Sequence, residues 1–177
     1  MEFPEALAFL DGRQETRWKL GLSRIEALLA SVGDPHVGLP AVHVAGTNGK
    51  GSFCAMLEAA LRGAGLKTGL TTSPHLHSPL ERIAVDGRPL SEADFARHLF
   101  RLKRSEPEES TYFELVTAAA FLHFRQERVD CAVVETGLGG RLDATNALRE
   151  PLLTVVTSIG YDHEPHLGDT LEKIAAE

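Results

Sequence analysis

Short apolar runs alternate along this chain with longer segments of helical periodicity. The apolar runs are residues 41–46 (AVHVAG), 66–72 (LKTGLTT), 131–136 (CAVVET) and 152–158 (LLTVVTS). Helical spacing is found at residues 4–10, 22–30, 51–64, 91–104 and 111–126, and Asp169-Thr170 begin a last helix. Unbroken apolar strands separated by helices are typical of a parallel sheet covered on both faces. We therefore predict an α/β fold with a largely parallel sheet flanked by helices.

The connections contain turn and cap signals. Asp86-Gly87 lies between apolar flanks, which predicts a β-hairpin. Residues 73–80 (SPHLHSPL) contain two prolines and are predicted to form a loop. The stretch Ser91-Glu-Ala-Asp94 predicts a capping box at the start of a helix.

Composition narrows the functional class. The 177 residues carry a net charge of −7, and 43% are hydrophobic, which indicates a folded domain and argues against a nucleic-acid surface. No run approaches the ~18 apolar residues of a membrane span, and the acidic N-terminus does not resemble a signal peptide. Cys54 and Cys131 lie in apolar surroundings without CxxC spacing, so we expect buried thiols in a reducing compartment. These observations predict a cytoplasmic protein without a nucleic-acid or membrane partner.

A glycine-rich segment follows the first apolar strand. Residues 46–52 read GTNGKGS and precede a helix, so they lie where α/β folds bind ligands. Glycines let backbone amides turn toward a phosphate, the helix N-terminus adds partial positive charge, and Lys50 supplies a full charge. The strict GxxxxGK[ST] pattern is not met, because Val44 replaces its first glycine and Gly51 separates Lys50 from Ser52. We interpret the segment as a phosphate-binding loop rather than a simple strand-to-helix turn.

Glu135 ends the apolar strand CAVVE. A carboxylate at a strand's carboxyl end, beside a phosphate loop, is a natural Mg²⁺ ligand. A second glycine-rich stretch, 137–146 (GLGGRLDATN), lacks GxGxxG, so NAD binding is rejected.

Several motifs, in order, resemble one family. The motifs are AGTNGKGS (45–52), TTSPHLHSPLERI (71–83), TYFELVTAAAF (111–121), ETGLGGRLDATN (135–146) and TSIGYDHEPHLGDTLEKIAAE (157–177), with KLGLSRIEALL (19–29) before them. Together they resemble the folylpolyglutamate synthase/dihydrofolate synthase family, the folate branch of the Mur ligase superfamily. The resemblance covers most of the chain from residue 41 onward.

The resemblance implies an activity and a domain organisation. Family members are ATP-dependent acid–amino-acid ligases that add L-glutamate to the carboxylate of a folate or dihydropteroate through an acyl phosphate. It implies ATP as co-substrate, two Mg²⁺ ions and a monomeric enzyme. Residues 1–40 would be an N-terminal helical segment on the substrate side, and residues 41–177 would be an incomplete P-loop ATPase domain.

The resemblance also assigns site residues. Lys50, Glu135 and His163 would be catalytic, and Ser73, Glu135 and His163 would hold metal. The ATP loop would be Thr47, Asn48, Gly49, Lys50, Gly51 and Ser52. The pterin side would be Leu20, Gly21, Leu22, Thr111, Tyr112, Phe113, Glu114, Leu142, Asp143 and Ala144. From the residues alone, Ser73 is an ordinary turn serine, and histidine is an unusual ligand for a hard cation.

Two alternatives stay open. One is a Mur-type amino-acid ligase of cell-wall precursors, against which SPHL and GLGGRLDATN favour folate. The other is a nucleotide-binding module without catalysis. Family members are longer than this sequence, so we expect a fragment, with a carbamylated lysine and the adenine and glutamate sites lying after residue 177.

Overall fold

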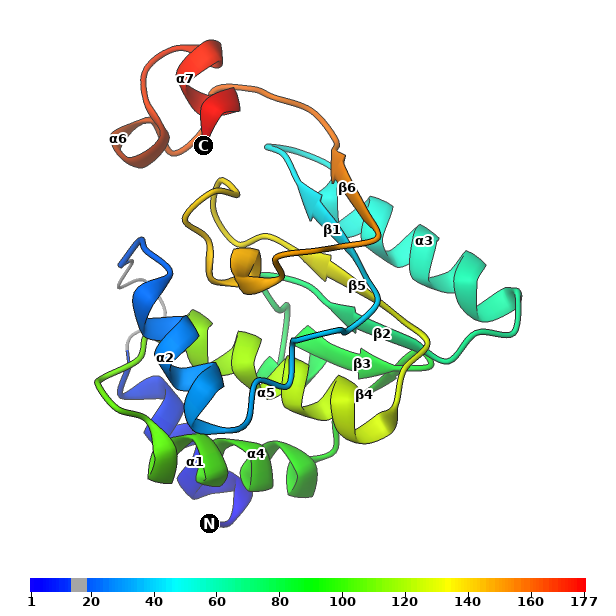
Figure 1. The fold of residues 1–177 in the computed structure, drawn as a ribbon, viewed down its shortest axis with the longest axis vertical. Helices are drawn as coiled ribbons and strands as arrows, with labels where there is room; N and C mark the ends of the chain where they lie inside the picture. The colour runs from blue at the N-terminus through cyan, green and yellow to red at the C-terminus, as the bar shows by residue number, and fades with distance from the viewer. Residues whose placement is uncertain (14–18) are drawn as a thin grey trace.

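A six-stranded sheet in the order β4-β3-β2-β5-β1-β6 forms the centre of the computed structural model, which describes residues 1–13 and 19–177 (Figure 1). The strands are β1 (Ala41–Ala45), β2 (Thr68–Thr71), β3 (Ile83–Val85), β4 (Arg88–Pro89), β5 (Cys131–Glu135) and β6 (Leu153–Val156). The four strands β2, β5, β1 and β6 are parallel, and β3 and β4 form an antiparallel edge. The prediction of a largely parallel sheet flanked by helices is confirmed.

Helices cover the two faces of the sheet unequally. The helices are α1 (Phe3–Asp11), α2 (Ser23–Ser31), α3 (Lys50–Gly63), α4 (Glu92–Ser105), α5 (Tyr112–Glu127), α6 (Glu164–Leu167) and α7 (Leu171–Ala176), with 3₁₀ turns η1 (Pro79–Arg82) and η2 (Ala144–Ala147). Figure 1 shows α3 on one side of the sheet and α5, backed by α1, α2 and α4, on the other. The short helices α6 and α7 lie beyond the carboxyl ends of β1 and β6.

The central strand β5 explains why both faces hold a core. Side chains alternate along a strand, so Ala132 and Val134 join the cluster formed with α1, α2, α4 and α5, while Cys131 and Val133 join the cluster under α3. Every residue of β5 is buried. The prediction that both cysteines are buried free thiols is confirmed.

Helix α5 approaches β2 closely at a glycine. A Cβ built on Gly69 would lie 2.8 Å from Cδ1 of Phe124, which no real side chain tolerates. Gly69 therefore allows the buried aromatic ring of α5 to rest directly on the strand.

The hairpin prediction is confirmed. Val85 pairs with Arg88 across the turn. Asp86 and Gly87 have φ of 50° and 71°, as the two central residues of a type I′ turn require.

Two local predictions are wrong. The apolar run 152–158 is not covered on both faces: its strand is the four-residue edge β6, and Leu153 and Val156 are 55% and 59% exposed. At Ser91 the side chain accepts from the backbone of Asp94, but the reciprocal bond of a capping box is absent from this described segment. A complete capping box instead begins α5, between Thr111 and Glu114.

Two smaller differences concern length and loops. The run 66–72 contributes only β2, four residues long. The predicted loop ends in the 3₁₀ turn η1, which its own capping box at Ser78 and Glu81 stabilises.

In the described part of the chain no helix is both long and apolar enough to cross a membrane.

Candidate active site

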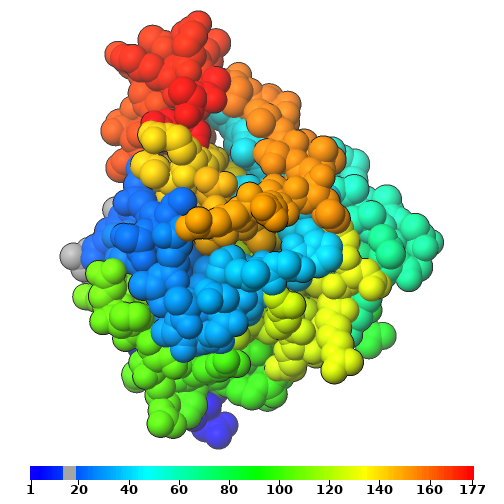
Figure 2. All heavy atoms as spheres, viewed as in Figure 1, coloured from blue at the N-terminus to red at the C-terminus, as the bar shows by residue number. Residues whose placement is uncertain are grey.

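Two cavities meet at the carboxyl edge of the sheet. The first has a volume of about 370 Å³ and lies between the α5 N-terminus, the loop after β2 and residues 19–21. The second has a volume of about 400 Å³ and lies between the loop after β1, the loop after β5 and the C-terminal segment. Figure 2 shows a hollow beside the loop after β5 and the C-terminal segment, which line the second cavity. Both cavities are lined by Lys50, Gly137, Leu138 and His163.

The predicted phosphate loop connects β1 to α3. Gly46 and Gly49 have φ of 131° and 82°, a region that favours glycine. A Cβ on Gly46 would lie 2.3 Å from the Thr157 hydroxyl oxygen. The loop is fixed from the β6 side, because the Thr47 N–H donates to Ser158 O at 2.7 Å and the Thr157 hydroxyl donates to Asn48 O at 2.8 Å.

The N-terminus of α3 is open to a ligand. Its N-cap, Gly49, makes no side-chain cap hydrogen bond, so the first N–H groups of this 14-residue helix add partial positive charge at the loop. Lys50 Nζ lies over the loop and donates to Gly46 O at 2.7 Å. Backbone donors, a helix terminus and one ammonium group together form a site suited to a phosphate.

The loops after β2 and β5 meet at Ser73 and Glu135. The Ser73 N–H donates to Glu135 Oε2 at 3.1 Å, and the Glu135 carboxylate is buried. Burial raises the pKa of Glu135, and the Ser73 N–H and the Lys50 charge counteract that effect. A Cβ on Gly51 would lie 3.6 Å from Glu135 Oε2, so α3 begins directly beside this carboxylate. A hydroxyl and a carboxylate are the oxygen donors that Mg²⁺ prefers, so these two residues fit such an ion.

His163 lies on the border of both cavities. Its φ of 50° places it in the left-handed region, and its N–H donates to Asp162 Oδ1 at 2.8 Å. Within residues 1–13 and 19–177, no group of three or more His, Cys, Asp and Glu side chains is arranged to hold a metal. His163 and Ser73 both line the first cavity.

Most residues predicted for the pterin side line the first cavity. They are Leu20, Gly21, Thr111, Tyr112, Phe113, Glu114, Leu142, Asp143 and Ala144. Leu22 differs: it is the N-cap residue of α2 and packs against the core. Of the predicted ATP loop, Thr47 and Lys50 line the second cavity, whereas Asn48, Gly49, Gly51 and Ser52 do not.

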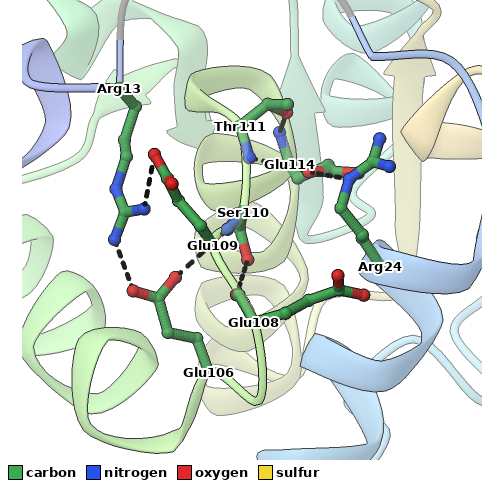
Figure 3. Close-up of polar contacts among 8 residues, drawn as sticks. All are labelled: Arg13, Arg24, Glu106, Glu108, Glu109, Ser110, Thr111 and Glu114. Carbon is green, nitrogen blue, oxygen red and sulfur yellow. Dashed lines mark hydrogen bonds and ion pairs between the residues drawn. The ribbon is translucent and has the colours of Figure 1, made fainter.

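Polar contacts fix the wall formed by the N-terminal segment and α5 (Figure 3). Glu114 accepts from the Thr111 N–H at 2.7 Å and forms an ion pair with Arg24 at 3.1 Å. Arg24 also donates to Lys19 O, which places residue 19 at the cavity. The ion pair engages Glu114 Oε1 and the Thr111 N–H engages Oε2, so both oxygens of this buried carboxylate have a partner within the wall.

A second cluster in Figure 3 anchors the α4–α5 connection. Arg13 forms ion pairs with Glu106 and Glu109, and Glu106 accepts from the Ser110 N–H. These contacts hold the turn that leads into the Thr111 cap of α5.

Sequence reasoning missed one buried charge in the first cavity. Arg82 is 3% exposed, donates from Nε to His75 Nδ1 at 2.8 Å and lies 5.2 Å from the centre of the Tyr112 ring. It lies within the TTSPHLHSPLERI motif, but an arginine in a sequence is usually a surface residue, so no local signal marked it. With Lys50 and Lys19 it adds positive charge to the cavity.

Comparisons with known proteins agree with this architecture. A scan against models of protein families finds no match. The chain is 44% identical to a dihydrofolate synthase/folylpolyglutamate synthase of Bacillus subtilis, over 99% of this chain and 42% of that protein. It is 42% identical to a protein of the same name from Mycobacterium tuberculosis, over 92% of this chain and 36% of that protein. The chain thus spans about two fifths of the length of these relatives.

Solved structures give the same result. An E. coli FolC structure in complex with DHPP and ADP matches with a TM-score of 0.91 and 38% identity, over 98% of this chain and 42% of that one. A folylpolyglutamate synthase–AMPPCP–folate complex matches with a TM-score of 0.91 and 34% identity, over 98% and 44%. By sequence and by structure, the chain belongs to the folylpolyglutamate synthase/dihydrofolate synthase family.

Proposed function

We propose that the protein containing this chain is an ATP-dependent ligase that adds L-glutamate to the carboxylate of a folate or dihydropteroate. The observation that carries the proposal is the meeting of two cavities at Lys50, one beside the phosphate loop and one beside the aromatic side chains of α5. A ligase that phosphorylates a carboxylate needs its two substrates to meet in this way. The related structures that contain ADP, or AMPPCP with folate, support the same pairing of ligands.

The nucleotide would bind in the second cavity, with its phosphates at residues 46–52. The N–H groups at the start of α3 and the Lys50 ammonium would hold the β- and γ-phosphates. Thr47 and Lys50 line this cavity and are the predicted loop residues closest to it.

Magnesium would be held by Ser73 and Glu135, and by His163, which lines both cavities. The ions would screen phosphate charge during transfer. The Ser73–Glu135 hydrogen bond keeps the two donors together, and the donor set is the one a hard cation takes.

The folate or dihydropteroate would occupy the first cavity. Phe113 and Tyr112 offer rings on which a pterin can stack, and the Glu114 carboxylate, which lines the same cavity, can accept from an amino group. The positive charges of Lys19, Lys50 and Arg82 favour a substrate that carries carboxylates.

The reaction then has two steps. A carboxylate oxygen attacks the γ-phosphorus, ADP leaves, and an acyl phosphate forms. The glutamate nitrogen attacks the acyl carbon and loses a proton, and inorganic phosphate departs with the former carboxylate oxygen. Lys50 stabilises the negative charge that moves between the phosphates in the first step.

We propose the matching division of the chain. Residues 41–177 contribute the phosphate loop and the metal side of an ATP-binding domain, and residues 1–40 contribute helices to the substrate side. The packing of α1 and α2 against α4 and α5 supports the second part, because it brings residues 19–21 to the first cavity.

A direct assay tests the proposal. The protein, prepared as its own cell produces it, is incubated with ATP, Mg²⁺ and L-glutamate, and with either dihydropteroate or tetrahydrofolate. A product heavier by one glutamate residue, formed with ADP, is expected. Tight nucleotide binding without any such product would favour the non-catalytic binding module instead.

A further inference from the structure

The loop after β5 is held by one buried carboxylate. Asp143 Oδ2 accepts from the N–H groups of Gly137 at 3.0 Å and Leu138 at 2.9 Å. Its Oδ1 accepts from the Thr145 N–H at 3.0 Å and from the Thr145 hydroxyl at 2.5 Å. Both oxygens of this residue, which is 4% exposed, are thus bonded within its own loop.

The chain of hydrogen bonds continues to the sheet. Thr145 Oγ1 lies 2.8 Å from His43 Nε2, in the centre of β1. Because the Thr145 hydroxyl gives its one proton to Asp143, it accepts the proton of His43 Nε2–H, which defines the tautomer of the ring. Burial lowers the pKa of His43 to about 4, so the ring is neutral near pH 7. His43 and Thr145 are both buried.

This chain of bonds ends at the wall between the two cavities. Gly137 and Leu138 line both of them, so the position of their backbone sets the shape of each. A Cβ on Gly137 would lie 2.7 Å from Phe113 Cζ, which shows how little room this backbone has on the pterin side. A shift of these two residues would therefore change both cavities together.

We propose that Thr145 and His43 are positioning residues, which act through Asp143 to hold the Gly137–Leu138 backbone in the one place where both substrates bind. The proposal rests on the proposed function for the identity of those substrates. In this proposal the Asp143 carboxylate anchors the loop, whereas a ligand in the first cavity contacts Gly137 and Leu138, which the loop places there. Thr145 lies within the motif 135–146, but neither it nor His43 was among the residues to which the sequence assigned a role.

A matched set of variants tests this. Thr145→Val removes the hydroxyl but keeps the shape, and Thr145→Ser restores the hydroxyl. Thr117→Val removes another buried threonine hydroxyl, on α5, from a residue that lines neither cavity. Binding of ADP and of dihydropteroate is measured by calorimetry on the protein as its cell produces it, and hydrogen exchange is measured at the Gly137 and Leu138 amides.

Thr145→Val should weaken the binding of both ligands by roughly tenfold, the cost of one hydrogen bond to a charged group. The same variant should speed exchange at Gly137 and Leu138 by a similar factor. Thr145→Ser should recover most of both losses, and Thr117→Val should cause neither. Loss of binding for one ligand only, or unchanged exchange at the two amides in Thr145→Val, would overturn the proposal.

Two precautions keep the test decisive. If Thr145→Val does not fold, His43→Leu is used instead, because it removes the donor to Thr145. It is compared with His43→Gln, whose amide keeps a donor. Faster exchange at Gly137 and Leu138 is then expected in His43→Leu and not in His43→Gln. Failure of the proposed function is distinguishable, because hydrogen exchange at Gly137 and Leu138 is measured independently of glutamate addition. A protein that adds no glutamate can therefore still be tested for faster exchange in Thr145→Val. Normal glutamate addition with no exchange effect would leave the function standing and reject the positioning role.

Discussion

The backbone N–H of Ser73 donates to Glu135 Oε2 at 3.1 Å, although the two residues are 62 positions apart in the chain. This bond joins the loop after β2 to the end of β5, two neighbouring parallel strands. The Ser73 hydroxyl and the second Glu135 oxygen take no part in this bond, and these are the donors that we propose for Mg²⁺. The contact explains why a serine in a loop and a glutamate at a strand end belong to one site.

Glu135→Gln should weaken Mg²⁺ binding in the proposed ligase. The amide keeps the shape and can still accept from Ser73 through its oxygen, but it loses the negative charge that attracts the ion. We expect the Mg²⁺ concentration at half-maximal activity to rise by roughly tenfold or more, the effect seen when one metal-site partner is lost. An unchanged magnesium titration would remove Glu135 from this role.

Gly137→Ala should damage the pterin side of the site. The new methyl group would lie 2.7 Å from Phe113 Cζ and 3.0 Å from its Cε2, so the ring must move. Dihydropteroate should bind roughly tenfold more weakly, as expected for a displaced stacking group worth about 1 kcal/mol or more. Gly63→Ala is the control, because nothing lies within 4 Å of a Cβ there. Equal affinities for dihydropteroate in the two variants would contradict this account.

Arg24→Met should destabilise the fold. It leaves the Glu114 carboxylate, whose side chain is 3% exposed, as an unpaired buried charge. Breaking such a pair costs about 3 kcal/mol, whereas losing an exposed pair costs less than about 1 kcal/mol. Urea unfolding should show the larger loss for Arg24→Met and the smaller one for Arg149→Met, which breaks the exposed Arg149–Glu26 pair.

The double variant Arg24→Met with Glu114→Gln completes the comparison. Removing the charge of Glu114 should restore part of the stability that Arg24→Met loses, because no unpaired carboxylate remains. If the double variant loses as much stability as the two single variants together, the ion pair does not stabilise the wall of the first cavity.

Stability should fall in mild acid. Burial lowers the pKa of His98 to about 4 and also lowers the pKa of His123, whose Nδ1 lies 3.3 Å from His98 Nε2. In the unfolded chain both rings take up protons below about pH 6.5, while in the folded protein they stay neutral. The free energy of unfolding is therefore highest above pH 6.5 and decreases as the pH falls from 6.5 toward 4.

The experiment compares urea unfolding at pH 7 and pH 5. His98→Phe should reduce the loss between these two values, because one buried ring no longer takes up a proton on unfolding. His77, in the exposed part of the loop after β2, supplies the control variant His77→Phe, which should leave the pH dependence as it is. Equal pH dependence in wild type and His98→Phe would reject the explanation.

The sequence predicted the elements well because each one carries its own signal. The apolar run of β5 is buried on both faces, and the Asp86-Gly87 turn has the backbone angles that its composition indicated. The exposed β6 could not be predicted in this way, since an apolar run reveals the composition of a strand but not which neighbours cover it. The capping box was expected at Ser91, although the same Ser/Thr-x-x-acid pattern at Thr111 is the one that forms it.

Prediction of the site likewise succeeded only where a residue carries a local signal in the sequence. Residues in glycine-rich loops and at strand ends could be predicted to lie near one another, because the topology brings the carboxyl ends of parallel strands together. Arg82 and Thr145 were missed, because an arginine and a threonine carry no mark of burial in the sequence, and only the fold places one in a cavity and the other between His43 and Asp143.

The central claim is that ATP in the second cavity transfers its γ-phosphoryl group to the carboxylate of a folate-type substrate in the first. The most direct measurement follows ¹⁸O from the labelled carboxylate of dihydropteroate in the presence of ATP, Mg²⁺ and L-glutamate. We predict that one labelled oxygen appears in inorganic phosphate, and that Lys50→Ala slows its appearance by about a hundredfold or more while Lys103→Ala, on α4, does not. Glutamate addition without labelled phosphate, or unimpaired transfer in Lys50→Ala, would contradict the account.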